Sequence, residues 1–237
     1  MAFSRTSVSL LAVALLAGCA TRWHRDPGFP TILKDFRHWQ LETEDRSARV
    51  SLRHGILDID TPAGATLWLR HELTGPVKIE FQATAVAAGG PNDQVSDLNA
   101  FWMANNVDDP LRPPFMKPRS GRFAEYNDLL TYYVGLGGNR NTTTRFRRYI
   151  GDPESRPLLP EHDLAAPETL LVPNRKQTIT LIADGEHIEY RRDGKPLFVY
   201  EDDAPYRRGW FALRTTHSHL RIEKVRIYRL PKRSVSR

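Results

Sequence analysis

Short runs in which apolar and polar residues alternate are the feature that most constrains the fold of this chain. The clearest run is Val77-Lys78-Ile79-Glu80-Phe81-Gln82-Ala83, with an apolar side chain at every second position. A period of two is typical of a strand with one buried face, because successive side chains of a strand point to opposite sides of the sheet. Short runs rich in β-branched, aromatic or other apolar residues, also read as strands, lie at 49–53, 56–60, 65–69, 178–182, 187–190, 197–200, 209–214 and 220–228.

Turn signals separate these runs. Asp184-Gly185 and Asp193-Gly194 are strong hairpin signals, because glycine adopts a positive φ at little cost. No long stretch has helical periodicity, and the sequence has no internal repeat. We therefore predict an all-β protein of about a dozen strands, folded as an antiparallel two-sheet sandwich of the jelly-roll type.

Two long proline-rich segments interrupt the strand pattern. Residues 108–121 contain four prolines, and residues 151–173 contain five. Long loops in a β domain often form the rims of a binding face. We expect these two segments to border the functional site.

The first residues resemble a bacterial lipoprotein signal. A basic residue, Arg5, precedes the apolar run 8–16, and Leu15-Leu16-Ala17-Gly18-Cys19 resembles a lipobox. The resemblance implies a diacylglycerol on Cys19 and an acylated amino terminus, which together give stable anchoring in the bacterial cell envelope. Ala20 and Thr21 are not acidic, which implies the outer membrane if two membranes are present. The alternative is an ordinary cleaved signal with an accidental cysteine.

These signals divide the chain into four predicted parts. Residues 1–18 are a signal peptide, 19–30 a tether, 31–230 one jelly-roll domain and 231–237 a basic tail. Cys19 is the one cysteine, so the domain is expected to be stabilised by its core rather than by disulfides. We expect it to act as a monomer.

The charge indicates an acidic partner. Loss of Arg5 with the signal peptide lowers the formal charge from +6 to +5. Export argues against nucleic acid, which leaves anionic lipid headgroups or acidic polysaccharides such as polyuronates. The alternative is that the positive charge is scattered and only keeps the protein soluble.

The segment 127–150 has more polar and aromatic side chains than a core strand requires. In a strand over 132–137, Tyr133 shares a face with Gly135 and Gly137, a shape that would let a ligand lie close to the backbone. After a turn at 138–141, the next strand places Arg145 and Arg147 on the same surface. Guanidinium groups bind carboxylates through two hydrogen bonds, which favours a uronic acid polymer as ligand. The alternative is a solvated strand face beside a packed tyrosine.

Further candidates surround this hairpin. Trp102 could stack on a sugar ring, although a strand tryptophan is more often a core residue. His217 and His219 form a His-x-His pair, but no third ligand lies nearby, so we predict no metal and no cofactor and an acid–base role instead. The predicted substrate-binding residues are Asn99, Trp102, Asn127, Asn139, Asn141, Arg147, Arg214 and His217.

Three runs resemble a known superfamily. They are Ser96–Met103, Tyr132–Tyr149 and 194–228, and they are similar to concanavalin A-like lectin/glucanase domains, above all to uncharacterised members from pectin and rhamnogalacturonan degradation. The resemblance covers about residues 31–230 and implies a jelly roll. It leaves the activity open, because the superfamily includes lectins, hydrolases and lyases. The Glu-x-Asp-x-x-Glu pattern of its retaining glucanases is absent from this sequence.

We therefore predict an anchored protein that acts on acidic polysaccharide, as a lyase by β-elimination. Tyr133 is the predicted base or acid, His219 its partner and Arg145 the clamp on the substrate carboxylate. The first alternative is a carbohydrate-binding lipoprotein without catalysis. The second is a glycoside hydrolase that uses Asp97, Glu125 or Asp128.

Overall fold

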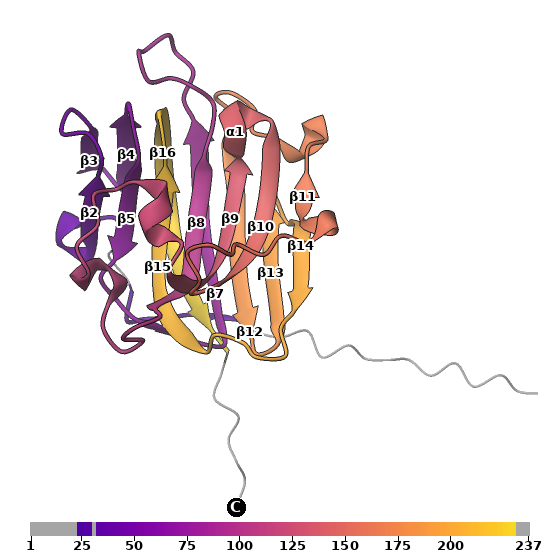
Figure 1. Ribbon diagram of the computed structural model, residues 1–237. Coiled ribbons are helices and arrows are strands. Elements are labelled where there is room, and N and C mark those ends of the chain that lie inside the picture. The colour runs from indigo at the N-terminus through magenta and orange to yellow at the C-terminus, as the bar shows by residue number, and fades with distance from the viewer. Residues whose placement is uncertain (1–22, 30–31, 231–237) are drawn as a thin grey trace, which may run out of the picture.

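The alternating run lies in β7 (Val77–Ala85), where buried and half-buried residues alternate along the whole strand. The computed structural model describes residues 23–29 and 32–230, which form two stacked antiparallel sheets (Figure 1). We name each sheet after its central strand, the β7 sheet and the β8 sheet. Each has eight strands, so the structure confirms the all-β, antiparallel two-sheet sandwich predicted from the sequence.

The β7 sheet joins strands from both ends of the chain. Its β1 (His24–Arg25) pairs with β16 (Ser218–Arg229) beside the main order. That order is β14 (Lys195–Glu201), β13 (His187–Arg192), β12 (Gln177–Asp184), β7, β16, β4 (Ile56–Thr61) and β3 (Arg49–Arg53).

The β8 sheet has a similar arrangement. Its β6 (Leu73–Thr74) pairs with β15 (Arg208–Thr215) beside the main order. That order is β11 (Asp163–Leu164), β10 (Thr143–Ile150), β9 (Leu129–Gly137), β8 (Leu98–Asn106), β15, β5 (Ala65–Leu69) and β2 (Trp39–Thr43).

Short helical turns connect the strands. The described residues contain five 3-10 turns, η1 (Phe36–His38), η2 (Pro114–Met116), η3 (Phe123–Tyr126), η4 (Pro160–His162) and η5 (Pro167–Thr169). The element α1 (Gly138–Asn141) joins β9 to β10, and Asn139 and Arg140 have positive φ there. It is therefore a left-handed turn, in keeping with the hairpin turn predicted at these residues.

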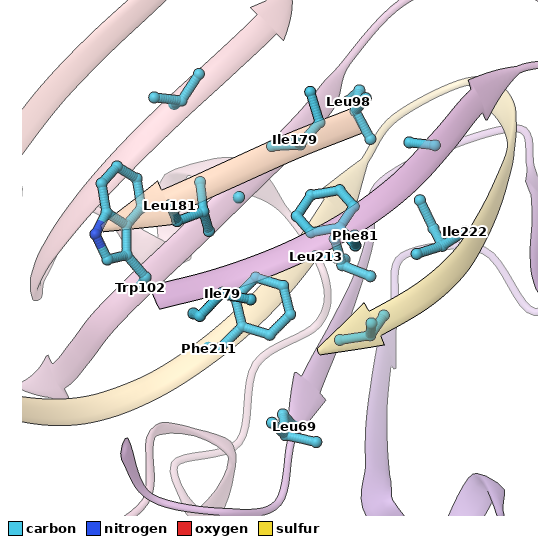
Figure 2. Close-up of a cluster of buried hydrophobic side chains, with 14 of the residues drawn as sticks. Leu69, Ile79, Phe81, Leu98, Trp102, Ile179, Leu181, Phe211, Leu213 and Ile222 are labelled. Atoms are coloured by element: carbon cyan, nitrogen blue, oxygen red, sulfur yellow. The ribbon is translucent and has the colours of Figure 1, made fainter. Parts of the chain in front are cut away.

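The main core lies between the two sheets. Figure 2 shows its centre, where Ile79 and Phe81 of β7 face Phe211 and Leu213 of β15. Tyr132, Val134 and Leu136 of β9 also belong to this core, as their spacing predicts. Because these side chains point inward, the alternate residues of the β8 sheet face away from the core.

A second apolar cluster lies on that outward face. It contains Trp68, Phe101, Ala104, Tyr126, Leu129, Tyr133, Tyr149, Trp210 and Ala212, with Phe115 and Phe123 packed against it. Phe115, Phe123 and Tyr126 come from the segment 107–128, which connects β8 to β9. This connection therefore covers part of the outward face and leaves the rest open.

The folded part begins before the predicted domain start at residue 31. His24 and Arg25 pair with Arg229 and Tyr228, and Phe29 is buried in the main core, so part of the predicted tether belongs to the fold. The predicted signal peptide 1–18, Cys19 and the tail 231–237 lie outside the described residues. None of the helices in the described part of the chain is long and apolar enough to cross a membrane.

Candidate binding pocket

A pocket of about 520 Å³ opens on the outward face of the β8 sheet. It lies where β8 begins and where β9 and β15 end. The strands and strand ends supply Asn99, Tyr133, Gly135, Thr143, Arg145, Arg147 and Arg214. The connections supply Glu44, Gln94, Ser96, Asp97, Phe123, Gly138, Asn139, Arg140, Arg156, Thr216 and His217.

The pocket is positively charged. Its lining contains five arginines, at positions 140, 145, 147, 156 and 214, but only two carboxylates, Glu44 and Asp97. Arg145 is already paired, because its Nε and Nη2 lie 2.7 and 3.0 Å from the two carboxylate oxygens of Asp163. The excess of guanidinium groups favours an anionic ligand.

Arg214 is the most deeply placed of these arginines, with only 3% of its surface exposed. Its Nη1 donates hydrogen bonds to Thr66 Oγ1 (2.7 Å) and to the Gly121 carbonyl (2.9 Å). The guanidinium also lies over the rings of Phe123 and Tyr126, 5.0 and 4.8 Å from their centroids. Among the described residues, its Nε and Nη2 have no hydrogen-bond partner. Arg214 forms no close ion pair there, although the charges of Glu42 and Asp97 interact with it from farther away. An anion that accepts hydrogen bonds from Nε and Nη2 would therefore stabilise this buried guanidinium.

Tyr133 forms the aromatic floor of the pocket. Its ring packs against Phe101, Tyr149 and Phe123, with centroids 5.0, 5.5 and 5.6 Å away. Burial, with smaller effects of Tyr149 and Asp97, raises the pKa of Tyr133 well above its ordinary value. The phenol therefore stays protonated at neutral pH and is suited to donate a hydrogen bond rather than to act as an anionic base.

The missing side chain at Gly135 makes room for the phenol of Tyr133 and not, as predicted, for a ligand close to the backbone. A Cβ atom there would lie 2.8 Å from the Tyr133 hydroxyl oxygen. The space above the glycine is therefore filled by the phenol of Tyr133, and a ligand cannot approach the backbone there. The pair Tyr133 and Gly135 fixes where the hydroxyl lies.

Asp97 and Asn99 supply hydrogen-bonding groups at the start of β8. Asn99 Nδ2 donates to Asp97 Oδ1 over 3.2 Å, and burial raises the pKa of Asp97. The Asn99 Oδ1 atom is buried and has no hydrogen-bond partner among the described residues. It is thus an acceptor suited to a ligand hydroxyl.

Most of the residues predicted from the sequence meet in this pocket. Asn99, Tyr133, Asn139, Arg145, Arg147, Arg214 and His217 all line it. Four predicted residues do not, namely Trp102, Asn127, Asn141 and His219.

Trp102 is a core residue and cannot stack on a sugar. It is 0% exposed and lies between the sheets, with its ring 5.6 Å from that of Tyr132. Asn141 instead holds a loop, since its side chain both donates to the Leu171 carbonyl and accepts from the Leu171 N–H. Asn127 donates a long hydrogen bond of 3.4 Å to the Pro153 carbonyl.

His219 does not face Tyr133. It lies on β16 of the β7 sheet, whereas Tyr133 lies on β9 of the β8 sheet. Its Nδ1 is 3.0 Å from Asp93 and its Nε2 is 3.1 Å from Asp58. The histidine therefore ties the connection before β8 to the β7 sheet, and the predicted Tyr133–His219 pair is not formed.

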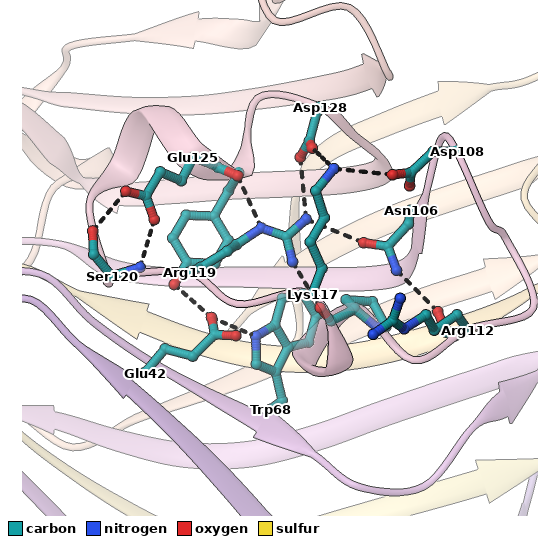
Figure 3. A network of polar contacts seen from close by, with 12 residues as sticks. Glu42, Trp68, Asn106, Asp108, Arg112, Lys117, Arg119, Ser120, Glu125 and Asp128 are labelled. Carbon is teal, nitrogen blue, oxygen red and sulfur yellow. Dashed lines mark hydrogen bonds and ion pairs between the residues drawn. The ribbon is translucent and has the colours of Figure 1, made fainter.

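Glu125 and Asp128 are also held away from the pocket, in the polar network of Figure 3. Glu125 accepts hydrogen bonds from the Ser120 backbone and hydroxyl. Asp128 pairs with Lys117 (2.6 Å) and Arg119 (3.1 Å). Of the three carboxylates proposed for hydrolysis, only Asp97 lines the pocket.

Several pocket residues were not singled out from the sequence. Arg156 lies in the second proline-rich segment, its guanidinium 5.5 Å from the centre of the Phe123 ring, and its carbonyl accepts a hydrogen bond from Arg147. Arg140, Glu44 and Phe123 also lie in connections. Periodicity carries no signal in such segments, and of these residues only Arg156 lies in a loop that was predicted to border the site.

No group of three or more His, Cys, Asp or Glu side chains in residues 23–29 and 32–230 is placed to hold a metal ion. The side chains that line the pocket can supply hydrogen bonding, ion pairing and proton transfer.

Two stacked antiparallel sheets with a pocket on one outward face define a β-sandwich of the galectin-like and concanavalin A-like class. Within that class, the chain belongs to the family described as "Domain of unknown function (DUF6250)", whose model matches residues 59–225. No curated protein matches the chain in sequence.

Similar solved structures support the fold. A Bacillus subtilis protein of unknown function with a galectin-like fold is 14% identical, covering 83% of this chain and 91% of its own, with a TM-score of 0.62. The carbohydrate-binding module CBM66 from Bacillus subtilis is 9% identical, covering 80% and 94%, with a TM-score of 0.53. A glycosidic hydrolase is 10% identical, covering 83% and 93%, with a TM-score of 0.51. At these identities the likeness concerns the fold alone.

Proposed function

We propose that this domain binds carbohydrate, and that its pocket takes a carboxylate-bearing sugar of an acidic polysaccharide or oligosaccharide. The observation that carries the proposal is Arg214, a buried guanidinium whose Nε and Nη2 have no partner among the described residues. A sugar carboxylate would supply a negative charge in direct contact and two acceptors in the geometry that guanidinium prefers.

The other pocket groups suit a sugar ring. Tyr133 and Phe123 supply aromatic surface, and the Asn99 Oδ1 atom supplies a hydrogen-bond acceptor for a hydroxyl group. Binding sites of this kind combine apolar walls with a few fixed polar groups. The similar structure of a carbohydrate-binding module supports the same proposal.

Calorimetry with acidic oligosaccharides and their carboxyl-reduced, neutral counterparts tests this function. We expect the acidic forms to bind and Arg214→Lys to weaken them at least tenfold, because lysine keeps the charge but not the paired hydrogen bonds. Arg221→Lys is the matched control, because Arg221 pairs with Asp58 on the β7 sheet. Equal affinity of Arg214→Lys and the parent protein, with both folded, would contradict the proposal.

Catalysis is the second candidate, favoured by the presence of Tyr133, Asn99 and Arg147 in one pocket. In β-elimination a base takes the proton at C5 of a uronate, the C4–O bond breaks and a C4–C5 double bond forms; His217, which lines the pocket, is the candidate base. With its raised pKa, Tyr133 suits the acid that protonates the leaving oxygen. A lyase would produce new reducing ends together with ultraviolet absorbance from the unsaturated non-reducing ends. A hydrolase using Asp97 would produce new reducing ends alone. Binding without either product favours the non-catalytic function.

We also propose that Cys19 carries the lipid anchor of an envelope-bound, monomeric protein. The support is the sequence Leu15-Leu16-Ala17-Gly18-Cys19 after a short apolar run. Metabolic labelling with a radioactive fatty acid should mark the parent chain and not Cys19→Ala. Label retained by Cys19→Ala would contradict lipidation at this residue.

A further inference from the structure

We infer that the pocket is closed at one end and takes the terminal carboxylate-bearing residue of a saccharide chain rather than an internal one. This inference rests on the proposed function and adds which part of the chain is bound. Its basis is the segment 119–123, which blocks the outward face of the β8 sheet beside Arg214.

Gly121 forms the block. It has a φ of +94°, and a Cβ atom there would lie 2.5 Å from the Glu44 backbone nitrogen and 2.7 Å from the Thr43 carbonyl carbon. The segment therefore touches the end of β2 with no room between. A saccharide lying across β10, β9, β8 and β15 could not continue over β2.

This block is held firmly by the network of Figure 3. The Arg119 side chain, 2% exposed, donates to the carbonyls of Pro114 (2.7 Å) and Glu125 (2.9 Å) and pairs with Asp128. Ser120 is bonded to the Glu125 carboxylate. Several charge-assisted hydrogen bonds act together, so the segment is a fixed wall of the pocket rather than a moving lid.

The second proline-rich segment extends the same wall. Arg156 lies over the ring of Phe123, and its carbonyl is bonded to Arg147. The two segments thus meet beside Tyr133. The exposed lining residues Asn139 and Arg140 lie in the turn after β9, which is separated from β15 by β8 and lies on the side of β15 away from β5 and β2.

Arg214 marks the closed end. Its Nη1 is bonded to the Gly121 carbonyl, which belongs to the wall itself. A carboxylate bound by the remaining N–H groups of Arg214 therefore belongs to a sugar that has reached the wall. The rest of the chain leaves past Asn139 and Arg140, where exposed side chains offer weaker contacts.

Calorimetry with uronate oligosaccharides of defined length tests this inference on the unaltered protein. We expect one protein per oligosaccharide at every length, and a nearly constant affinity per chain end. Binding to internal sugars would instead increase the number of protein molecules bound per oligosaccharide as the oligosaccharide becomes longer. Blocking one of the two ends with a bulky group should abolish binding, while blocking the other should leave it unchanged.

The outcomes separate the two proposals. Stoichiometry that rises with length, or binding that survives a block at either end, overturns the inference and leaves the proposed function standing. Failure of every acidic oligosaccharide to bind overturns the proposed function, and the inference with it. One protein molecule per oligosaccharide, with binding abolished by a block at one end only, supports both the proposed function and the inference.

Discussion

At the scale of single residues, the pocket depends on a tyrosine fitted to a glycine. Tyr133 is 6% exposed, and its hydroxyl oxygen lies only 2.8 Å from the place that a Cβ atom at position 135 would take. The sequence predicted that these two residues share a face, and both line the pocket while Tyr132, Val134 and Leu136 lie in the main core. It did not predict their contact, because the direction of a side chain along its strand is set by packing against neighbours.

Tyr133→Phe should weaken saccharide binding about three- to tenfold, the usual effect of losing one hydrogen bond. The ring contacts with Phe101 and Tyr149 remain, so the melting temperature should change little. Calorimetric titration and thermal unfolding of the same sample measure both. Unchanged affinity would show that the hydroxyl does not touch the ligand.

Gly135→Ala should also weaken binding, although Tyr133 itself is intact. The added methyl group would lie within 3.3 Å of two ring carbons and 2.8 Å of the hydroxyl oxygen, so the phenol must move. Comparison of its affinity with that of Tyr133→Phe tests this. An affinity equal to that of the parent protein would mean that the hydroxyl position is unimportant.

At the scale of elements, strands with two buried faces limit what a sequence can predict. In β7 buried and half-buried residues alternate, and the sequence predicted this strand correctly. In β8 all nine residues are buried, because the segment 107–128 covers part of its outer face. Periodicity cannot assign faces in such a strand, which is why Trp102 was a candidate for sugar stacking although it lies in the core.

Trp102→Phe should lower the free energy of unfolding by about 1–3 kcal/mol through a smaller side chain in the main core. Its Nε1 has no hydrogen-bond partner among the described residues, so loss of that donor adds no cost. Saccharide affinity should stay within about twofold, because distant sites act nearly independently. Denaturant unfolding and calorimetry measure the two effects. Lost binding with unchanged stability would restore Trp102 as a ligand contact.

We expect the folding stability of the protein to depend on pH through Glu42, which contacts the segment 107–128 that covers part of the β8 sheet. This buried carboxyl accepts hydrogen bonds from Trp68 (2.9 Å) and from Tyr126 (2.6 Å), and Tyr126 belongs to η3. Burial raises its pKa above the ordinary value, although both hydrogen bonds oppose the shift. The folded state therefore holds this proton more tightly than the unfolded state does.

Glu42→Gln should reveal this effect. The contribution of Glu42 to stability falls as pH rises from the ordinary pKa of about 4.5 through the raised one, because only the unfolded chain has then lost the proton. Relative to the parent, Glu42→Gln should gain stability across that window. Denaturant midpoints over a pH series measure it, with Glu44→Gln as a control on a partly exposed carboxylate. If the denaturant midpoints of the parent protein and Glu42→Gln differed by the same amount at every pH, the prediction would be wrong.

At the scale of the whole molecule, pairing between distant segments decided which residues meet. Arg145, Arg147 and Tyr133 come together through one hairpin, β9 and β10, and local sequence was enough to predict that. His217 and His219 are separated in sequence by Ser218 alone, yet β16 begins at Ser218 and pairs with β4 and β7. His217 thus lines the pocket while His219 belongs to the other sheet, an outcome set by long-range register.

The charge of the pocket should make binding sensitive to salt. Five arginines line it, and screening shortens from about 10 Å at 0.1 M to about 3 Å at 1 M salt. The affinity for an acidic oligosaccharide should fall several-fold over that range, and that for a carboxyl-reduced one should not. Titrations of both ligands at each salt concentration measure this. Equal salt dependence of the two would exclude a charge-based preference.

The last strand also determines how the pocket would be presented. The twelve residues of β16 run from Ser218, beside the pocket residue His217, to Arg229, which pairs with His24. At roughly 3.3 Å per residue, its two ends are about 40 Å apart. If the chain is attached to a surface through the residues before Trp23, it is held by the end remote from the pocket. The fold itself would then act as a spacer that keeps the pocket away from that surface.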